Sequence, residues 1–140
     1  MSAGEAARVA PAIEGLIARL ARGRLGEIEP SGFTTTQLLA LATIVENGPV
    51  QLRVLAERIG TTKATASRST DVLEAAGLVV RLPDPADGRS ILIRATPAGR
   101  RARQDALQRL TEMVERLLAT LEEGDRARFV ELMERLDELL

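Results

Sequence analysis

Apolar residues recur at intervals of three and four near both ends of the chain, with charged residues between them. This spacing predicts amphipathic helices. Over residues 5–28 the apolar positions are Val9, Ile13, Leu16, Ile17, Leu20 and Leu25. A long helix is expected from Pro97, which suits its first turn, with Thr96 as its cap and Gly124 as its end. Its apolar stripe is Leu107, Leu110, Val114, Leu117, Leu118 and Leu121. A last helix is expected from Phe129 to the C-terminus.

The middle of the chain carries shorter helical patterns. A linker over residues 27–32 precedes a predicted helix over residues 34–45, and residues 50–59 and 63–76 predict two more helices. Gly60 lies in the turn between these last two. Two short helices joined by a turn that contains glycine are typical of the helix-turn-helix motif.

After these helices the pattern changes to that of strands. Thr62 suits the N-cap of the last short helix, and Gly77 suits its end. Residues 78–82 and 90–94 predict two strands, joined by the turn-forming run Pro83-Asp84-Pro85-Ala86-Asp87-Gly88. A helix followed by a hairpin with an arginine at its tip is how a winged helix holds duplex DNA. The helix fills a major groove, and the wing reaches the backbone or the adjacent minor groove.

These elements predict a mainly α protein that forms one domain over residues 1–140. A winged helix-turn-helix lobe with a small antiparallel β-hairpin would occupy residues 34–96, flanked by helices over residues 5–32 and 97–140. Amphipathic helices need a partner for their apolar faces. The first and last helices could cover each other within one chain. Their leucine content exceeds what one small domain can cover, which favours a homodimer built from the flanking helices.

Composition narrows the chemistry. The chain has no Cys, His, Trp or Tyr, which excludes disulfides, Cys/His zinc sites and histidine acid–base catalysis. It shows no nucleophile–base set, phosphate loop or metal-ligand cluster, so we expect no enzyme activity, no cofactor and no metal. It also shows no signal-peptide pattern and no apolar run of membrane-spanning length, so a cytoplasmic location is expected.

The net charge of −1 conceals a separation of charge along the chain. Residues 49–103 carry 10 basic and 5 acidic side chains, whereas residues 104–140 carry 5 basic and 10 acidic ones. A basic segment on an acidic chain indicates a polyanionic partner. An arginine-rich composition that only reflects a GC-rich genome is the alternative, but it does not explain the crowding between Arg81 and Arg103.

Several motifs in one register resemble the MarR family of bacterial transcription regulators. The resemblance runs from about Thr34 to Gly99 and rests on Leu55-Ala56-Glu57-Arg58-Ile59-Gly60, Ser67-Arg68, Leu73-Glu74, Gly77-Leu78-Val79, Asp84-Pro85-x-Asp87-x-Arg89-Ser90 and Thr96-x-x-Gly99. The hairpin tip is the specific signal, because many helix-turn-helix proteins share the first motif. Gln51 departs from the pattern, since Ser or Thr commonly caps the third helix there.

The candidate DNA-binding residues lie on the helix over residues 63–76 and on the hairpin. A helical wheel places Ala66, Ser69, Val72, Leu73 and Ala76 on the packed side. The predicted DNA-binding residues of the helix are Thr62, Lys63, Ser67, Arg68 and Thr70, and those of the hairpin are Asp87 and Arg89, with Arg81 and Arg94 as second-tier candidates for phosphate contact. Thr62 could act as a cap alone, and Arg68 could instead pair with Asp71 or Glu74.

The resemblance implies a minor-groove position for Arg89, oriented by an ion pair with Asp87. It also implies a homodimeric regulator of double-stranded DNA with a pseudo-palindromic operator, usually a repressor that a small molecule releases. No ligand motif is visible, but a pocket lined by Leu, Ile, Val, Met and Phe33 with an arginine as charged anchor would suit an organic acid. The alternative function is a winged helix that serves as a protein-interaction module without operator binding.

Overall fold

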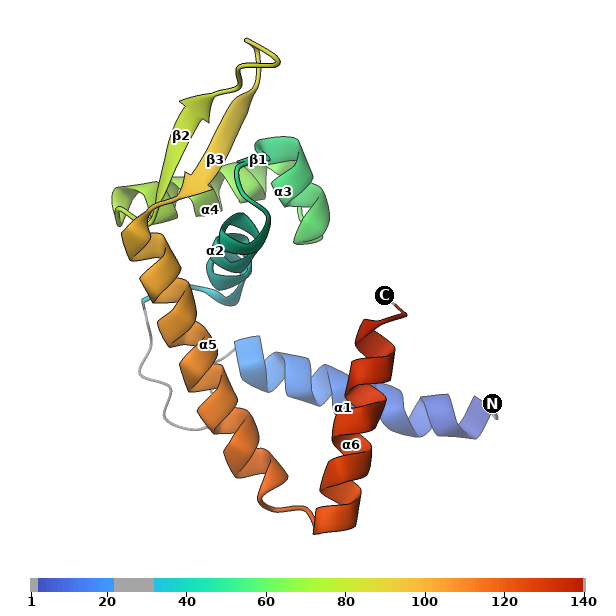
Figure 1. Ribbon diagram of the computed structural model, residues 1–140. Coiled ribbons are helices and arrows are strands. Elements are labelled where there is room, and N and C mark those ends of the chain that lie inside the picture. The colour runs from blue at the N-terminus through green and yellow to red at the C-terminus, as the bar shows by residue number, and fades with distance from the viewer. Residues whose placement is uncertain (1–2, 22–31, 140) are drawn as a thin grey trace. The chain divides into compact units, whose positions relative to one another are not determined.

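A computed structural model describes residues 3–21 and 32–139 of the chain, and Figure 1 labels its helices and strands. Two compact units divide the chain, residues 1–106 and 107–140, and α5 continues from the first into the second. The elements are α1 (Ala3–Ala21), α2 (Thr35–Asn47), β1 (Val50–Gln51), α3 (Leu52–Arg58), α4 (Lys63–Ala75), β2 (Val79–Pro83), β3 (Ile91–Ala95), α5 (Pro97–Leu118) and α6 (Glu123–Asp137).

The mainly helical winged helix-turn-helix expected from the sequence is confirmed, with one more strand than predicted. The sheet is antiparallel in the order β1-β3-β2. Val50 and Gln51, expected to begin the third helix, instead pair with Ile93 and Leu92 of β3. A strand of two residues is too short to show an alternating pattern, and its pairing depends on a segment about forty residues further along.

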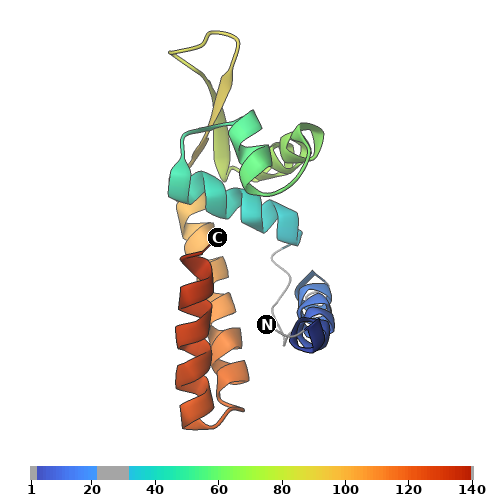
Figure 2. The same cartoon turned by 90° about the vertical axis from the view of Figure 1, so that its right-hand side faces the viewer.

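The core of the lobe lies between the sheet and helices α2, α3 and α4. Its largest buried side chains are Leu41, Ile44, Leu55, Leu73 and Ile93. Each such side chain contributes roughly 1.5–3 kcal/mol through burial of apolar surface. Figure 2 shows the β2–β3 hairpin extending beyond these helices, so that its loop is free to meet a partner.

Local signals set the ends of α4 as the sequence predicts. The Thr62 hydroxyl accepts a hydrogen bond from the Thr65 backbone N–H at 3.1 Å, which confirms the N-cap. Gly60 and Gly77 have φ values of +67° and +73° at the two turns that flank α4. Glycine adopts this left-handed conformation without the penalty that a Cβ atom brings.

The beginning of α5 is fixed to the lobe by several bonds. The Thr96 hydroxyl accepts from the Gly99 N–H at 3.0 Å, which confirms its role as a cap, and donates to the Gly77 carbonyl at 2.7 Å. Further along the helix, the Arg103 guanidinium pairs with Glu46 of α2 at 2.8 Å. Two alanines of the same turns pack against the core, Ala98 and Ala102.

Arg81 joins strand β2 to the outer surface of α4. Its guanidinium lies 2.7 Å from an Asp71 carboxylate oxygen and 2.9 Å from a Glu74 carboxylate oxygen, and it also donates to the Ser67 carbonyl at 3.3 Å. The Arg81 side chain is only 23% exposed. This Arg81 network therefore holds the hairpin against the helix and neutralises both α4 carboxylates.

The end of α5 differs from the prediction. Gly124 does not break this helix, because α5 ends at Leu118 and Gly124 is the second residue of α6. Instead, the Arg126 guanidinium donates to the carbonyls of Leu118 and Leu121, each at 3.1 Å. The first bond reaches the last carbonyl of α5, where the helix supplies no i+4 donor, and the second reaches the loop that follows.

The second unit exposes most of its apolar residues. Met113 is buried, but an apolar stripe lies open along α5 and α6. This α5–α6 stripe consists of Leu107, Leu110, Val114, Leu117, Phe129, Val130, Leu132, Met133 and Leu136. Helix α1 likewise exposes Val9, Ile13, Leu16 and Ile17. The remainder of the helix expected over residues 5–28, and the linker up to residue 31, lie outside the described residues.

Replacing Gly99 by alanine should destabilise the lobe. Gly99 is buried, and an added Cβ would collide with the backbone carbonyl oxygen of Leu78. A collision with backbone forces the helix start to shift, so we expect a loss of about 2–4 kcal/mol in the free energy of unfolding by urea. Gly124→Ala is the control, because no atom lies within 4 Å of its Cβ position and it should not destabilise. Equal stability of the two variants would contradict this view of the α5 start.

Replacing Arg81 by alanine should loosen the attachment of the hairpin to α4. The variant loses two ion pairs and leaves Asp71 and Glu74 uncompensated. We expect a loss of about 1–2 kcal/mol, less at high salt, measured by urea unfolding. Arg94→Ala removes an exposed arginine of β3 and should change stability by less than about 0.5 kcal/mol. A similar loss in both variants would show that the Arg81 network has no special role.

Candidate nucleic-acid interface

Helix α4 presents a polar face opposite the face that packs on the core. Its outward residues include Lys63, Arg68 and Asp71, all exposed, while Ser67 is half-buried. Arg68 donates to the Thr65 hydroxyl at 3.3 Å, so the guanidinium lies along the first turns of the helix rather than beside Asp71 or Glu74. Because the Arg81 network occupies both carboxylates, the positive charge of Arg68 is left for an external partner.

The helical wheel drawn from the sequence misplaces Thr70 and Val72 of α4, and also Ala76 directly after it, which was placed on the packed side and is exposed. Thr70, predicted to face DNA, is fully buried, and its hydroxyl donates to the Ala66 carbonyl at 2.8 Å. Val72, predicted to pack inward, is 40% exposed. A hydroxyl that bonds to its own helix can be buried at little cost, so polarity alone misjudges the packed face. Thr70 therefore does not face DNA, and its prediction as a DNA-binding residue is wrong.

Two aspartates shape the loop of the wing. Asp84 accepts from the Ala86 N–H at 2.9 Å, and the Asp84 N–H donates to the Ser90 carbonyl at 3.1 Å. Asp87 accepts from the Arg89 N–H at 3.1 Å and from the Ser90 hydroxyl at 2.9 Å. Aspartate side chains that bond to the backbone two residues on are typical of tight turns. The loop is thus ordered by its own polar groups.

The expected ion pair between Asp87 and Arg89 is not formed. Asp87 contacts the backbone of Arg89, and the Arg89 guanidinium pairs with no carboxylate among the described residues. Asp87 therefore orients Arg89 by fixing the conformation of the turn. The exposed arginine at the tip keeps its full charge for a partner.

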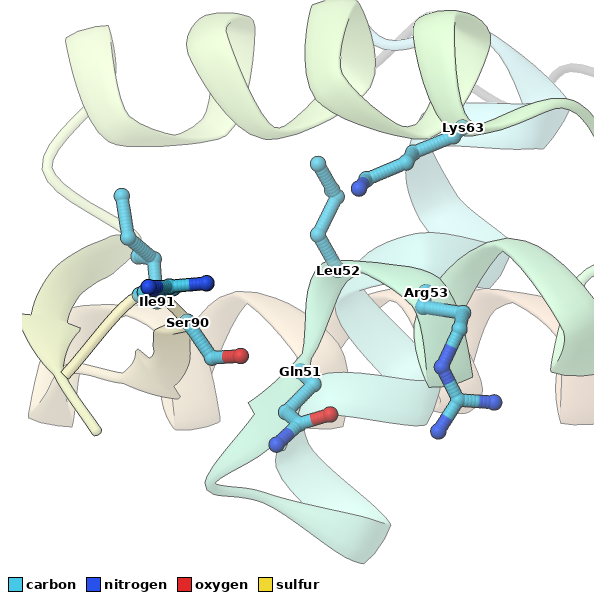
Figure 3. A pocket seen from close by; sticks show the side chains of 7 residues that line it. Gln51, Leu52, Arg53, Lys63, Ser90 and Ile91 are labelled. Carbon is cyan, nitrogen blue, oxygen red and sulfur yellow. The ribbon is translucent and has the colours of Figure 1, made fainter. Parts of the chain in front are cut away.

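A cleft of about 370 Å³ opens between the wing and the N-terminal ends of α3 and α4. Figure 3 shows Lys63 extending from α4 toward Leu52, with Arg53 on α3 and Ser90 and Ile91 on the wing around the same space. The full lining is Gln51, Leu52, Arg53, Lys63, Arg89, Ser90 and Ile91. Three of these residues are cations and none is an acid, although Arg53 also pairs with the exposed Glu57 at 3.0 Å. The cleft is suited to an anionic chain such as a phosphate backbone.

Sequence reasoning missed the residues that support the wing from β1. The Gln51 side-chain amide donates to Asp84 at 2.9 Å, and this bond is the main reason why the pKa of Asp84 lies below its ordinary value. The Ala86 N–H lowers the pKa of Asp84 further, against the opposing effect of burial. The only sequence signal was the departure at Gln51 from the usual capping residue.

Most of the predicted site residues lie in the cleft or on the outward face of α4, and Arg81 lies apart from them. Lys63 and Arg89 line the cleft, and Thr62, Ser67 and Arg68 lie on or beside the outward face of α4. Arg81 faces the α4 carboxylates instead, so its phosphate contact stays a prediction without support from its position. Among the residues described, no cluster of metal-ligating side chains occurs and no helix is long and apolar enough to cross a bilayer.

Comparisons with known proteins agree with this geometry. Residues 31–90 match the MarR family. An uncharacterized HTH-type transcriptional regulator of Bacillus subtilis (strain 168), YxaD, is 32% identical over 114 residues, which are 81% of this chain and 76% of YxaD. A probable transcriptional regulator from Pseudomonas aeruginosa has a solved structure that is 31% identical with a TM-score of 0.67, covering 87% of this chain and 95% of that one.

The PcaV transcriptional regulator from Streptomyces coelicolor, solved in complex with its natural ligand, is similar over nearly the whole chain. It is 26% identical, with a TM-score of 0.67, covering 99% of this chain and 98% of that one. Transcription regulators of the MarR family are DNA-binding proteins and not enzymes. The arginine-tipped wing, the exposed face of α4 and these similarities lead to one conclusion: the chain belongs to the MarR family of DNA-binding transcription regulators.

Proposed function

We propose that the protein acts as a homodimer that binds a pseudo-palindromic operator and represses transcription until a small organic molecule releases it. The observation that carries the DNA-binding mode is the cleft between the wing and α4, where Lys63 and Arg89 have no acidic partner among the described residues. The two cations stand on either side of a space that a phosphate backbone would fill.

The outward face of α4 would enter the major groove. Arg68 is exposed on this face and can bind a guanine edge through two hydrogen bonds. Ser67 and Thr62 lie close to it and can bind bases or phosphates. The wing would then carry Arg89 to the adjacent minor groove, where the concentrated negative potential favours arginine. In this arrangement α4 recognises base edges in the major groove, and the wing recognises the width and potential of the minor groove.

The exposed apolar residues support the homodimer. The α5–α6 stripe and the apolar residues of α1 would be costly to leave in water, because each buried side chain contributes roughly 1.5–3 kcal/mol. A second copy offers the same stripe in a two-fold arrangement. Two DNA-binding lobes related by this symmetry would meet two half-sites about one helical turn apart, which matches a pseudo-palindromic operator.

Release by an effector rests on similarity to other regulators. PcaV has been solved with its natural ligand, which supports a small-molecule response in this chain as well. With no His, Tyr, Trp or Cys available, a ligand pocket would be lined by Leu, Ile, Val, Met and Phe33, with an arginine as the charged anchor. An organic acid is therefore the effector class that we propose.

The two arginines should contribute differently to recognition. With an operator selected from bound genomic fragments, Arg89→Ala should weaken binding to many sequences by roughly 10–100-fold for the dimer, because two contacts of about 1 kcal/mol each are lost. Arg68→Ala should relax preference at one symmetric pair of positions by about 1–3 kcal/mol. Arg116→Ala removes the same charge from the acidic part of the chain and should bind normally. Fluorescence anisotropy over a salt series measures all three.

Unchanged binding by Arg89→Ala across a set of operators would contradict the proposed contact of the wing. With about four phosphate contacts per half-site, the logarithm of the binding constant of the parent should fall with the logarithm of the salt concentration with a slope of about −6 to −8. Each neutralised phosphate contributes about −0.9 to this slope. A slope flatter than about −2 would point to a protein-interaction module rather than a DNA-binding protein.

The chain should sediment as a dimer at micromolar concentration. Phe129→Glu places a charge within the α5–α6 stripe and should shift the equilibrium to a monomer of about 15 kDa. Arg128→Glu changes the charge of the neighbouring exposed position and should leave the dimer intact. Sedimentation equilibrium that finds only monomers of the parent chain would rule out the homodimer.

A further inference from the structure

The bond between Gln51 and Asp84 crosses the whole sheet. Gln51 of β1 pairs with Leu92 of β3, which pairs in turn with Leu82 of β2. Residues opposite one another in a sheet point to the same face, and so does Asp84, two residues beyond Leu82. The Gln51 amide therefore passes over the middle strand and binds the opposite edge at 2.9 Å.

Asp84 occupies the point where the wing leaves the sheet. Its residue is 8% exposed, and its carboxylate binds both the Gln51 amide and the Ala86 N–H. Its backbone N–H closes the hairpin on the Ser90 carbonyl. A change at Asp84 would thus be transmitted to the loop that ends in Arg89.

Gln51 is attached to the helices on its other side. It is the N-cap residue of α3, yet its side chain makes no capping bond and is used for Asp84 instead. Gln51 also lines the cleft together with Lys63 and Arg89. One side chain thus connects the base of the wing to the helix-turn-helix.

We propose that Gln51 is a positioning residue that sets the angle of the wing, and so the separation of Arg89 from α4, for simultaneous contact with one duplex. This inference rests on the proposed function of the wing. Without the bond, the hairpin keeps its own internal hydrogen bonds, but the loop at its end moves more freely relative to β1 and α3. Arg89 then spends less time where the minor groove requires it, and binding weakens through Arg89 alone.

A merely structural role for the same bond makes a different prediction. In that case loss of Gln51 would weaken the lobe in general, and its effect on DNA binding would not depend on Arg89. A double-mutant cycle distinguishes the two roles, because coupled residues give non-additive effects. The cycle uses Gln51→Leu, Arg89→Ala and the double variant in the full chain, with anisotropy on the selected operator at one fixed salt concentration.

We expect Gln51→Leu to weaken operator binding about tenfold for the dimer, as two lost hydrogen bonds would. In the Arg89→Ala background the same substitution should change binding by less than about twofold. Gln104→Leu, at an exposed position of α5, is the matched control and should bind as the parent does. Gln51→Asn keeps the polar amide but shortens the side chain, so that the amide no longer reaches Asp84. It should therefore weaken binding as Gln51→Leu does. Cooperative thermal melts of each variant establish that the lobes are folded.

Equal losses from Gln51→Leu in both backgrounds would overturn the positioning role, as would normal binding by both Gln51 variants. If Gln51→Leu does not fold, the same cycle with Gln51→Asn decides the matter. Failure of the proposed function has a separate signature, because Arg89→Ala would then bind as tightly as the parent whatever residue stands at position 51.

Discussion

The lobe depends on the middle strand of its sheet. β3 pairs with β1 on one side and with β2 on the other, and its Ile93 lies 1% exposed in the core shared with the helices. The helix-turn-helix, which begins directly after β1, and the wing, which consists of β2 and β3, are therefore parts of one hydrogen-bonded layer. The position of the wing relative to α4 depends on this pairing, on the Arg81 network and on the bond between Gln51 and Asp84.

Features encoded by neighbouring residues could be predicted from the sequence. The Thr62 cap, the glycine turns beside α4 and the hairpin with Arg89 at its tip all depend on groups a few residues apart. The same holds for the Thr96 cap of α5. Short-range geometry limits such groups to a few arrangements, so the residue types indicate the structure directly.

Features formed between distant residues could not be predicted. β1 has two residues and exists because β3 lies beside it, and the bond from Gln51 to Asp84 spans 33 positions. Thr70 was misplaced because a helical wheel gives angles but not the direction of the core, and its hydroxyl could be satisfied within α4. The ion pairs of Arg81 with two α4 carboxylates likewise could not be predicted, since within the helix the sequence suggests Arg68 as their partner.

The way α5 begins has a mechanical consequence. Its first turns are bonded to the Gly77 corner, to Glu46 of α2 and to the core, and Gly99 leaves no room for even a methyl group against Leu78. A helix anchored at several points cannot pivot at its base without breaking them together. Any bending or rotation further along α5 would therefore move the lobe as a rigid body. The start of α5 is therefore a rigid part of the lobe, because a rotation of its first turns would carry the Gly77 corner, α2 and the core with it.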